Sequence, residues 1–524
     1  TAIGNTALTA NTSGSSNVAV GAESMDSNTT GGQNVAIGYQ SLQSNTTADH
    51  NTAVGRASMY NNTTGSNNSA FGKDSFYANT TGTQNTALGR SCLESNTTAD
   101  SNTGVGHNAL AANTTGTRNT AVGVQSLDSN TTANNNTAIG YQSLTANTTG
   151  SDNTSMGDTS LASNTTGANN SAFGEGALAA NTTADDNSAF GKNALTTNST
   201  GTQNVAVGNY SLQANTTAGN NTAVGYESLK ANTTGTANVA VGRRALHVAT
   251  TGDRNVGIGQ GVLESNTTAS DNVAVGNGAM GYNTTGSDNT AIGSAALQQN
   301  TTGARNTGVG LEAGKNLTTA SDNTYLGRRA GYTNATGENN VAVGVSAMED
   351  AASSAENNVC IGKTSGFALT GDNNTALGFQ SLKANTSGNQ NVAIGSNALT
   401  ANTTAVNNTA CGKSSLQGNT TGASLTAVGQ GSLANNTTAN NNTAVGKDSL
   451  NLNTTGSDNT AVGRSSLGSC TTGALNVAVG YYALGSNTTG DFNVALGEQA
   501  LYANTTADDN TALGHRTLQV NTTG

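Results

Sequence analysis

The side chains that could carry acid–base, nucleophilic or metal chemistry are few and lie far apart in the sequence. The four histidines are His50, His107, His247 and His515. A catalytic triad or a metal site needs several such groups within one concavity. The adjacent acids Asp185–Asp186 and Asp508–Asp509 fall in variable polar turns, where solvated carboxylates are the ordinary interpretation. We therefore predict that the chain is not an enzyme and has no catalytic residue, cofactor or metal ion.

The cysteines do not suggest a disulfide framework either. They are Cys92, Cys360, Cys411 and Cys470. Each lies at a different position of the repeat described next, in a different copy. Two cysteines can be bridged only when their Cα atoms lie within about 7 Å. We interpret all four as small apolar substitutes.

The element that must position every side chain is a 17-residue repeat, typified by 136–152. Copies open at Asn17, Asn34, Asn51 and so on to Asn510, and the opening Asn is position zero below. Dividing 524 residues by 17 gives about 31 copies. So short a unit is stable only when it stacks on its neighbours, and its apolar spacing fits no amphipathic helix. The predicted fold is an all-β, parallel β-solenoid of about 31 coils.

Two apolar positions and one glycine define each coil. Position three is apolar, as in Ile37, Ile139 and Val207, and position eight is usually leucine, as in Leu42, Leu144 and Leu212. We predict that both positions point inward and that each coil holds two short strands. Position four is always glycine, for example Gly38, Gly140 and Gly208, and we interpret it as a corner with positive φ or close backbone contact.

Two asparagines recur in nearly every regular coil, although Leu425 stands in for one opening asparagine. They are the opening residue, such as Asn136, and position eleven, such as Asn147. Identical amides stacked at one position form hydrogen-bonded ladders in other parallel stacks. We predict a structural ladder rather than glycosylation of the Asn-Thr-Thr sequons. The absence of proline agrees, because proline removes a ladder hydrogen bond.

The pattern predicts a single rod with three stretches. Residues 1–305 and 374–524 are regular, and 306–373 are irregular. In the irregular stretch Gly314, Gly331 and Gly366 replace the position-eight leucine, which predicts a thinner core. This stretch is either a tolerated irregularity or a bend or partner-binding patch. The chain begins and ends within a copy, so we expect an excerpt of a longer protein.

The composition of the chain disfavours some classes of binding partner. Only 9% of residues are charged and the net charge is -11, which disfavours nucleic acids and anionic membranes. No apolar run is long enough for a membrane-spanning helix, so we expect no membrane insertion in this segment. Positions five and six carry basic and aromatic residues such as Tyr39 and Arg56, and positions fifteen and sixteen carry acids such as Asp49 and Asp152. These edges of opposite sign could pair between parallel rods.

The repeat resembles the head repeats of trimeric autotransporter adhesins. The resemblance lies in Asn34–Gly38 and Asn391–Gly395 (Asn-Val-Ala-Ile-Gly) and Asn204–Gly208 (Asn-Val-Ala-Val-Gly), each followed by a Ser/Ala-Leu pair. It implies a left-handed parallel β-roll, side-by-side association of three chains and a place at the cell surface. Similar arrays occur in phage tail fibres and large bacterial surface proteins.

Together these features predict an extracellular, non-enzymatic fibre. The expected role is an adhesin-like shaft or head that gives reach and multivalent contact with a host or neighbouring cell surface. The alternative is a filament in which copies of the chain stack end to end. A phage tail fibre and an ice-binding solenoid are further alternatives, although the two adjacent threonines of Asn-Thr-Thr point to opposite faces.

Overall fold

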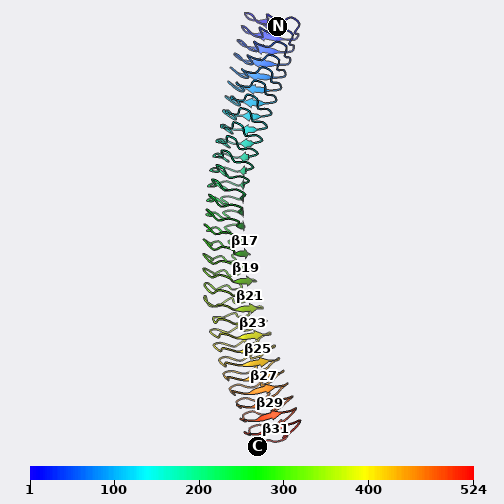
Figure 1. The fold of residues 1–524 in the computed structure, drawn as a ribbon, viewed down its shortest axis with the longest axis vertical. Helices are drawn as coiled ribbons and strands as arrows, with labels where there is room; N and C mark the ends of the chain where they lie inside the picture. Colours follow the sequence, from blue (N-terminus) through cyan, green and yellow to red (C-terminus); the bar gives the residue numbers. More distant parts are fainter. Residues whose placement is uncertain (524) are drawn as a thin grey trace. The chain divides into compact units, whose positions relative to one another are not determined.

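The computed structural model of the chain describes residues 1–523. Within them it holds 31 short strands and no helix. The chain divides into two compact units, Thr1–Gln260 and Gly261–Gly524. In each unit the strands stack one upon the next along the sequence, one per coil (Figure 1). The predicted parallel β-solenoid is therefore confirmed.

The strands of the first unit are β1 (Ala2–Ile3), β2 (Val18–Val20), β3 (Val35–Ile37), β4 (Thr52–Val54), β5 (Ser69–Phe71), β6 (Thr86–Leu88), β7 (Thr103–Val105), β8 (Thr120–Val122), β9 (Thr137–Ile139), β10 (Thr154–Met156), β11 (Ser171–Phe173), β12 (Ser188–Phe190), β13 (Val205–Val207), β14 (Thr222–Val224), β15 (Val239–Val241) and β16 (Val256–Ile258). Those of the second unit are β17 (Val273–Val275), β18 (Thr290–Ile292), β19 (Thr307–Val309), β20 (Thr324–Leu326), β21 (Val341–Val343), β22 (Val359–Ile361), β23 (Thr375–Leu377), β24 (Val392–Ile394), β25 (Thr409–Cys411), β26 (Thr426–Val428), β27 (Thr443–Val445), β28 (Thr460–Val462), β29 (Val477–Val479), β30 (Val494–Leu496) and β31 (Thr511–Leu513).

Neighbouring strands pair in parallel and in exact register with the repeat. Thr137 lies opposite Thr154, and Ile139 lies opposite Met156. Every strand after the two-residue β1 is three residues long, because the glycine at position four ends it. The register places identical positions directly above one another, so every side-chain type of the repeat becomes a column.

The other side of the coil is not a second strand, and this part of the prediction is wrong. Its backbone still bonds from coil to coil: Leu144 donates to the carbonyl of Ser160 (3.0 Å) and Thr148 to that of Thr165 (2.9 Å). However, φ is +51° at Gln142 and +55° at Leu144, a left-handed conformation that interrupts an extended strand. The segment is therefore a run of turns that keeps the hydrogen-bond ladder of a sheet.

The interior of the coil is narrow and partly polar. Leu42, Leu144 and Leu212 are fully buried, as are the alanine at position two, such as Ala138, and both asparagines. Position three was predicted to point inward, and this is wrong: Ile37 is 41% exposed, Val207 38%, and Ile139 is half-buried. Side chains alternate along a strand, so a buried position two places positions one and three outside.

The glycine at position four cannot be replaced without strain. Its φ is +138° at Gly38, +139° at Gly140 and +128° at Gly208, a region that L side chains rarely adopt. A Cβ at Gly140 would also overlap the carbonyl oxygen of Gly157 in the next coil. Positive φ and close backbone approach therefore both require glycine at this corner.

The two asparagines form the ladders that the repeat predicts. The side-chain oxygen of Asn119 accepts a hydrogen bond from the backbone N–H of Asn136 (2.9 Å), one coil further on. Asn147 donates from Nδ2 to Oδ1 of Asn130 (3.0 Å). Both Asn136 and Asn147 also donate to the carbonyl of Gly150 (2.9 Å each). These bonds satisfy the buried amides, and a fully buried Asn147 is not accessible to glycosylation.

The irregular stretch fills its core by a different route, so the predicted thinning is wrong. Tyr325 occupies position two of β20 and is fully buried. A Cβ at Gly314 would lie 2.7 Å from its ring, and one at Gly331 would overlap the ring as well. Tyr325 therefore takes the space of two missing leucines. The buried Leu317, one coil before Tyr325, and Leu369, two coils after it, replace the asparagine of position eleven.

The 18- and 16-residue copies at Asn340 and Asn358 leave the sheet intact. Val341 still lies opposite Val359, and Val359 opposite Thr375. The turn that stands in place of Asn-Thr-Thr in these copies absorbs the length changes: Asn340 Nδ2 reaches the carbonyl of Ala355 (2.7 Å), the place that Gly150 takes in a regular coil. The strands thus tolerate changes of length in the turns.

Candidate association surface

The outer side of the stacked strands is an extensive and unusual surface in each unit. We call the residues at positions one and three of the strands the sheet face. Position one is Thr, Ser or Val, and position three is aliphatic or aromatic apart from Met156 and Cys411. Position-three side chains that stay exposed include Ile37, Phe71, Leu88, Phe190, Ile292, Leu326, Leu377, Val428, Val445 and Val462.

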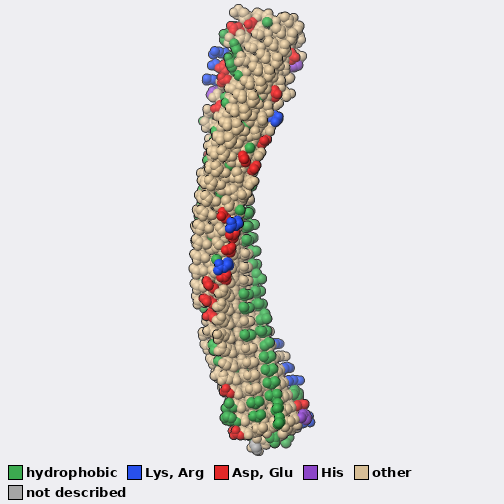
Figure 2. Space-filling view, viewed as in Figure 1, with side chains coloured by type: hydrophobic (Ala, Val, Ile, Leu, Met, Phe, Trp, Pro, Cys, Tyr) green, Lys and Arg blue, Asp and Glu red, His purple; other side chains and the backbone are tan. Residues whose placement is uncertain are grey.

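The sheet face is continuous and uncharged along the described strands. In Figure 2 an apolar stripe runs down the second unit over the strands labelled β17 to β31 in Figure 1. Fourteen strand-to-strand steps at about 4.8 Å make this stripe roughly 65–70 Å long. Where aromatic residues meet, they stack: the rings of Phe173 and Phe190 are 4.8 Å apart and nearly parallel. Monomeric soluble proteins rarely expose a contiguous apolar surface of this extent.

One edge next to the sheet face carries the basic and aromatic residues of position five. Tyr39, Tyr141 and Tyr226 are all strongly exposed, and so is Arg56. Side chains within one rod do not cover them. This edge is therefore free to contact another molecule.

The acidic residues of positions fifteen and sixteen have a structural role as well as a charge. Asp49 accepts the backbone N–H of Gly32 (2.6 Å), and Asp100 accepts that of Thr83 (2.6 Å). Asp322 pairs with Arg305 of the preceding coil through two hydrogen bonds (2.7 and 2.8 Å), which lower the pKa of Asp322. Both members of this pair are exposed, so the pair adds little stability. Carboxylates here hold successive turns together while they face solvent.

The remaining reactive groups do not form a second site in the part of the chain that is described. Burial raises the pKa of Cys92, Cys360 and Cys470 to about 12, so these thiols are unreactive. Cys411 differs, because it lies at position three of β25 on the sheet face and is partly exposed. Residues 1–523 contain no group of three or more His, Cys, Asp or Glu side chains placed to hold a metal ion. They also contain no helix of the length and hydropathy that a membrane span requires.

The predicted residues thus separate into three places. Leu42, Leu144 and Leu212 lie in the core, Gly38, Gly140 and Gly208 at the corner, and Asn136 and Asn147 in the ladders. The sheet face contains Ile37, Ile139 and Val207, which were predicted to lie in the core. The sequence contains a signal for this arrangement: position two is nearly always alanine, and a position that tolerates only small residues is typical of the crowded side of a strand.

Comparison with known proteins adds no family to this description. The chain matches no protein-family model, and a search of curated proteins also finds no match.

Proposed function

We propose that the chain is a non-enzymatic structural fibre whose sheet face binds other copies of the same chain side by side. The supporting observation is the continuous, uncharged sheet face, with its row of apolar side chains at position three, over successive strands of each unit. Burying apolar surface contributes about 25 cal/mol per Å². A contact repeated in every coil therefore adds up along the fibre even when each coil contributes little.

The two edges beside the sheet face fit such an association. A parallel neighbour brings the basic and aromatic edge of one rod next to the acidic edge of the other. Arg56 and Lys73 on one edge and Asp49 and Asp152 on the other have complementary charges and are exposed. Charge complementarity of this kind sets register and orientation more than affinity.

Outside the cell, such a fibre provides reach and many identical contacts. Many weak contacts to a host or neighbouring cell surface give avidity that no single coil has. The role is adhesin-like, in keeping with the resemblance of the repeat to adhesin heads, and a trimer is the assembly that this resemblance implies.

The test is the mass of the particle in solution with and without charges on the sheet face. The triple variant Val428→Glu, Val445→Glu, Val462→Glu places three carboxylates on adjacent exposed strands. The matched control is Thr438→Glu, Thr455→Glu, Thr472→Glu, which places the same charges at exposed threonines in the same coils, away from the strands. Analytical ultracentrifugation should give the mass of an oligomer for the wild type and the control, and the mass of a monomer for the sheet-face variant. Circular dichroism should show that this monomer is folded.

The labelling rate of Cys411 provides a second measurement of self-association, on the unmodified protein. It lies between Ile394 and Val428 on the sheet face, and the other three thiols are buried. Its labelling by a thiol reagent should slow as protein concentration rises. A wild-type monomer at all concentrations with constant labelling would contradict the proposal. Particles that lengthen with concentration in electron micrographs would instead support the end-to-end filament.

A further inference from the structure

The apolar surface beside the sheet face becomes wider at one place in the second unit. Position sixteen, the residue before each opening asparagine, is polar or alanine in the other coils, but it is Leu475 before β29 and Phe492 before β30. Position one of these two strands is Val477 and Val494. In Figure 2 the apolar stripe broadens at this end of the second unit, near the strands labelled β29 and β31 in Figure 1. Positions sixteen, one and three thus form three apolar columns here.

The backbone at position sixteen disfavours large side chains. The φ angle is +57° at Leu475 and +56° at Phe492, a left-handed conformation that asparagine and aspartate tolerate and that bulky residues rarely adopt. The leucines of position eight, such as Leu484, have the same conformation, but they are fully buried. Leu475 is 46% exposed and Phe492 is 53% exposed, so burial within one chain does not offset their strain. Strain of this kind points to a function of the side chains.

The opposite end of β29 is apolar as well. Tyr481 lies at position five, directly after the corner glycine, and it is partly exposed. Its ring packs edge to face on the ring of Tyr482, with 4.5 Å between the centroids, and the guanidinium of Arg464 lies 5.6 Å from its own centroid. β29 is therefore flanked by Leu475 at one edge of the sheet face and by Tyr481 at the other.

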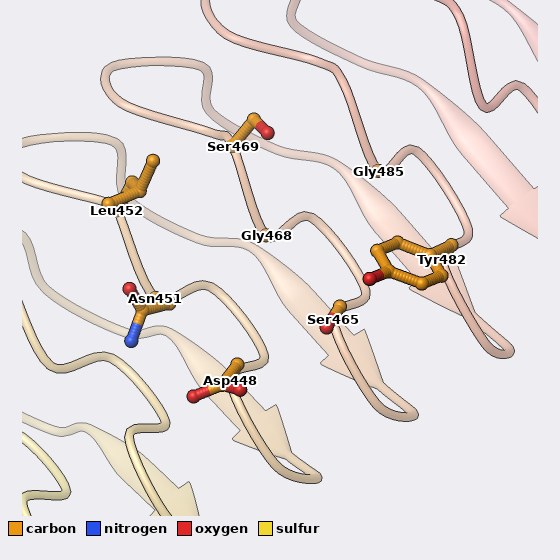
Figure 3. Close-up of a pocket in the computed structure, with 8 residues that line it drawn as sticks. All are labelled: Asp448, Asn451, Leu452, Ser465, Gly468, Ser469, Tyr482 and Gly485. Atoms are coloured by element: carbon orange, nitrogen blue, oxygen red, sulfur yellow. The ribbon is translucent and has the colours of Figure 1, made fainter.

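The turn side of the same coils has a different character. Figure 3 shows Tyr482 there, with Asp448, Ser465 and Asn451 around an open hollow. The Asn451 amide donates to the carbonyl of Gly431 in the preceding coil (2.7 Å), so it holds the coils together. The large exposed apolar surface is thus on the sheet face and its two edges.

We propose that Leu475, Phe492 and Tyr481 form an anchor between two copies of the chain, with Tyr481 of one copy packed against Leu475 and Phe492 of the next. This inference rests on the proposed side-by-side association and gives its place. A closed assembly of parallel rods is symmetric about an axis along the rods, so equivalent strands lie at the same height. The position-five edge of one copy then meets the position-sixteen edge of the next. A strand with apolar residues at both edges is complementary to itself in this arrangement.

Charged residues surround the three anchor residues. β28 has Asp458 at its position-sixteen edge and Arg464 at its position-five edge, so the same arrangement brings opposite charges together one coil before the anchor. One coil after it, the Glu498 carboxylate lies 3.8 Å from His515 of the following coil. An apolar centre with a polar rim is the usual organisation of a contact between proteins.

The test is analytical ultracentrifugation of the full chain carrying Leu475→Asn and Phe492→Asn. Position sixteen carries asparagine in Asn135 and Asn220, so the fold accepts both changes. The double variant should raise the dissociation constant of the oligomer about ten- to hundred-fold. The melting temperature of the dilute monomer should not fall, because asparagine relieves the left-handed strain.

The matched control removes a leucine and an aromatic ring of the same exposure from the turn side. Leu452 is 47% exposed and Tyr282 is 52% exposed, and both lie at position ten of coils in the second unit. Position ten carries serine in Ser44, so the control is Leu452→Ser with Tyr282→Ser. Its dissociation constant should equal that of the wild type.

Tyr481→Gln tests the other side of the anchor. It introduces the residue that position five carries in Gln430, and it should weaken association as much as the double variant does. Combining the two should add little, because the three side chains share one contact. A wild-type chain that stays monomeric would overturn the proposed association and the anchor with it. A wild-type oligomer whose dissociation constant is unchanged in the double variant, or rises equally in the turn-side control, would overturn the anchor alone.

Discussion

The regular coil 136–152 and the irregular coils of 306–339 reach the same filled interior with different side chains. In the regular coil Leu144 at position eight fills the interior, and position two is the small Ala138. In the irregular coils Gly314 and Gly331 stand at position eight, and Tyr325 at position two supplies the volume instead. The comparison teaches that the coil requires a filled interior rather than a particular residue at a given position.

The two kinds of coil also differ in the backbone strain at position eight. Leu144 has φ of +55°, and the glycines at the same position have +57° and +62°. A left-handed conformation costs an L-residue about 1–2 kcal/mol, and glycine avoids that cost. The leucine coils therefore accept backbone strain in exchange for burial, whereas the glycine coils relax the backbone and bury a ring from a neighbouring position.

The largest expected effect is that of Tyr325→Ala. Removing a fully buried aromatic ring destabilises by about 3–5 kcal/mol, and here it empties two coils at once. Because coils of a solenoid depend on their neighbours, the loss should appear as faster amide hydrogen exchange in 306–357 and not in 17–260. Tyr325→Phe keeps the ring and serves as the control. Unchanged exchange in Tyr325→Ala would show that the ring does not fill the core.

The corresponding change in a regular coil is Leu144→Ala. We expect a loss of about 2–5 kcal/mol, confined to one coil and its neighbours. Amide exchange should accelerate in 119–170 only. A segment of accelerated exchange as wide as that of Tyr325→Ala would remove the distinction between a residue that fills one coil and a residue that fills two.

A smaller effect is expected when the usual leucine is restored in the irregular stretch. Gly331→Leu places a side chain where the ring of Tyr325 already lies, and overpacking of this kind costs about 1–3 kcal/mol. In the Tyr325→Ala background the same change should stabilise, because the cavity then accepts the leucine. A double-mutant cycle on free energies of unfolding measures this coupling. Additive effects of the two changes would contradict the shared space.

The smallest effect is expected at position three. Ile139→Asp should change the stability of a dilute, monomeric chain by about 1 kcal/mol or less, because the half-buried side chain lies on the outer side of the strand. Ala138→Asp, one residue earlier, should unfold its coil, because it buries an unpaired charge. Thermal unfolding at low protein concentration measures the difference in stability between the two variants. Equal destabilisation would mean that the strand has no distinct inner and outer side.

Much of the architecture follows from the repeat alone. The period identifies a stack of coils, the unvarying glycine identifies the corner at Gly140, and the paired asparagines identify the ladders of Asn136 and Asn147. These features are local, because each depends only on contact between equivalent residues of successive coils. A fixed period places those residues next to each other.

Which side of the strand faces inward was decided only by the tertiary structure. Ile139 is larger and more apolar than Ala138, so the sequence favoured the isoleucine as the core residue, yet the alanine is inside. The reason is space: Leu144, Asn136 and Asn147 occupy the narrow interior, and only a small side chain fits beside them. The same holds for Tyr325, which enters the core only where Gly314 and Gly331 leave room. Sequence determined the repeating unit, but the volume left inside the closed coil determined which side chains it buries.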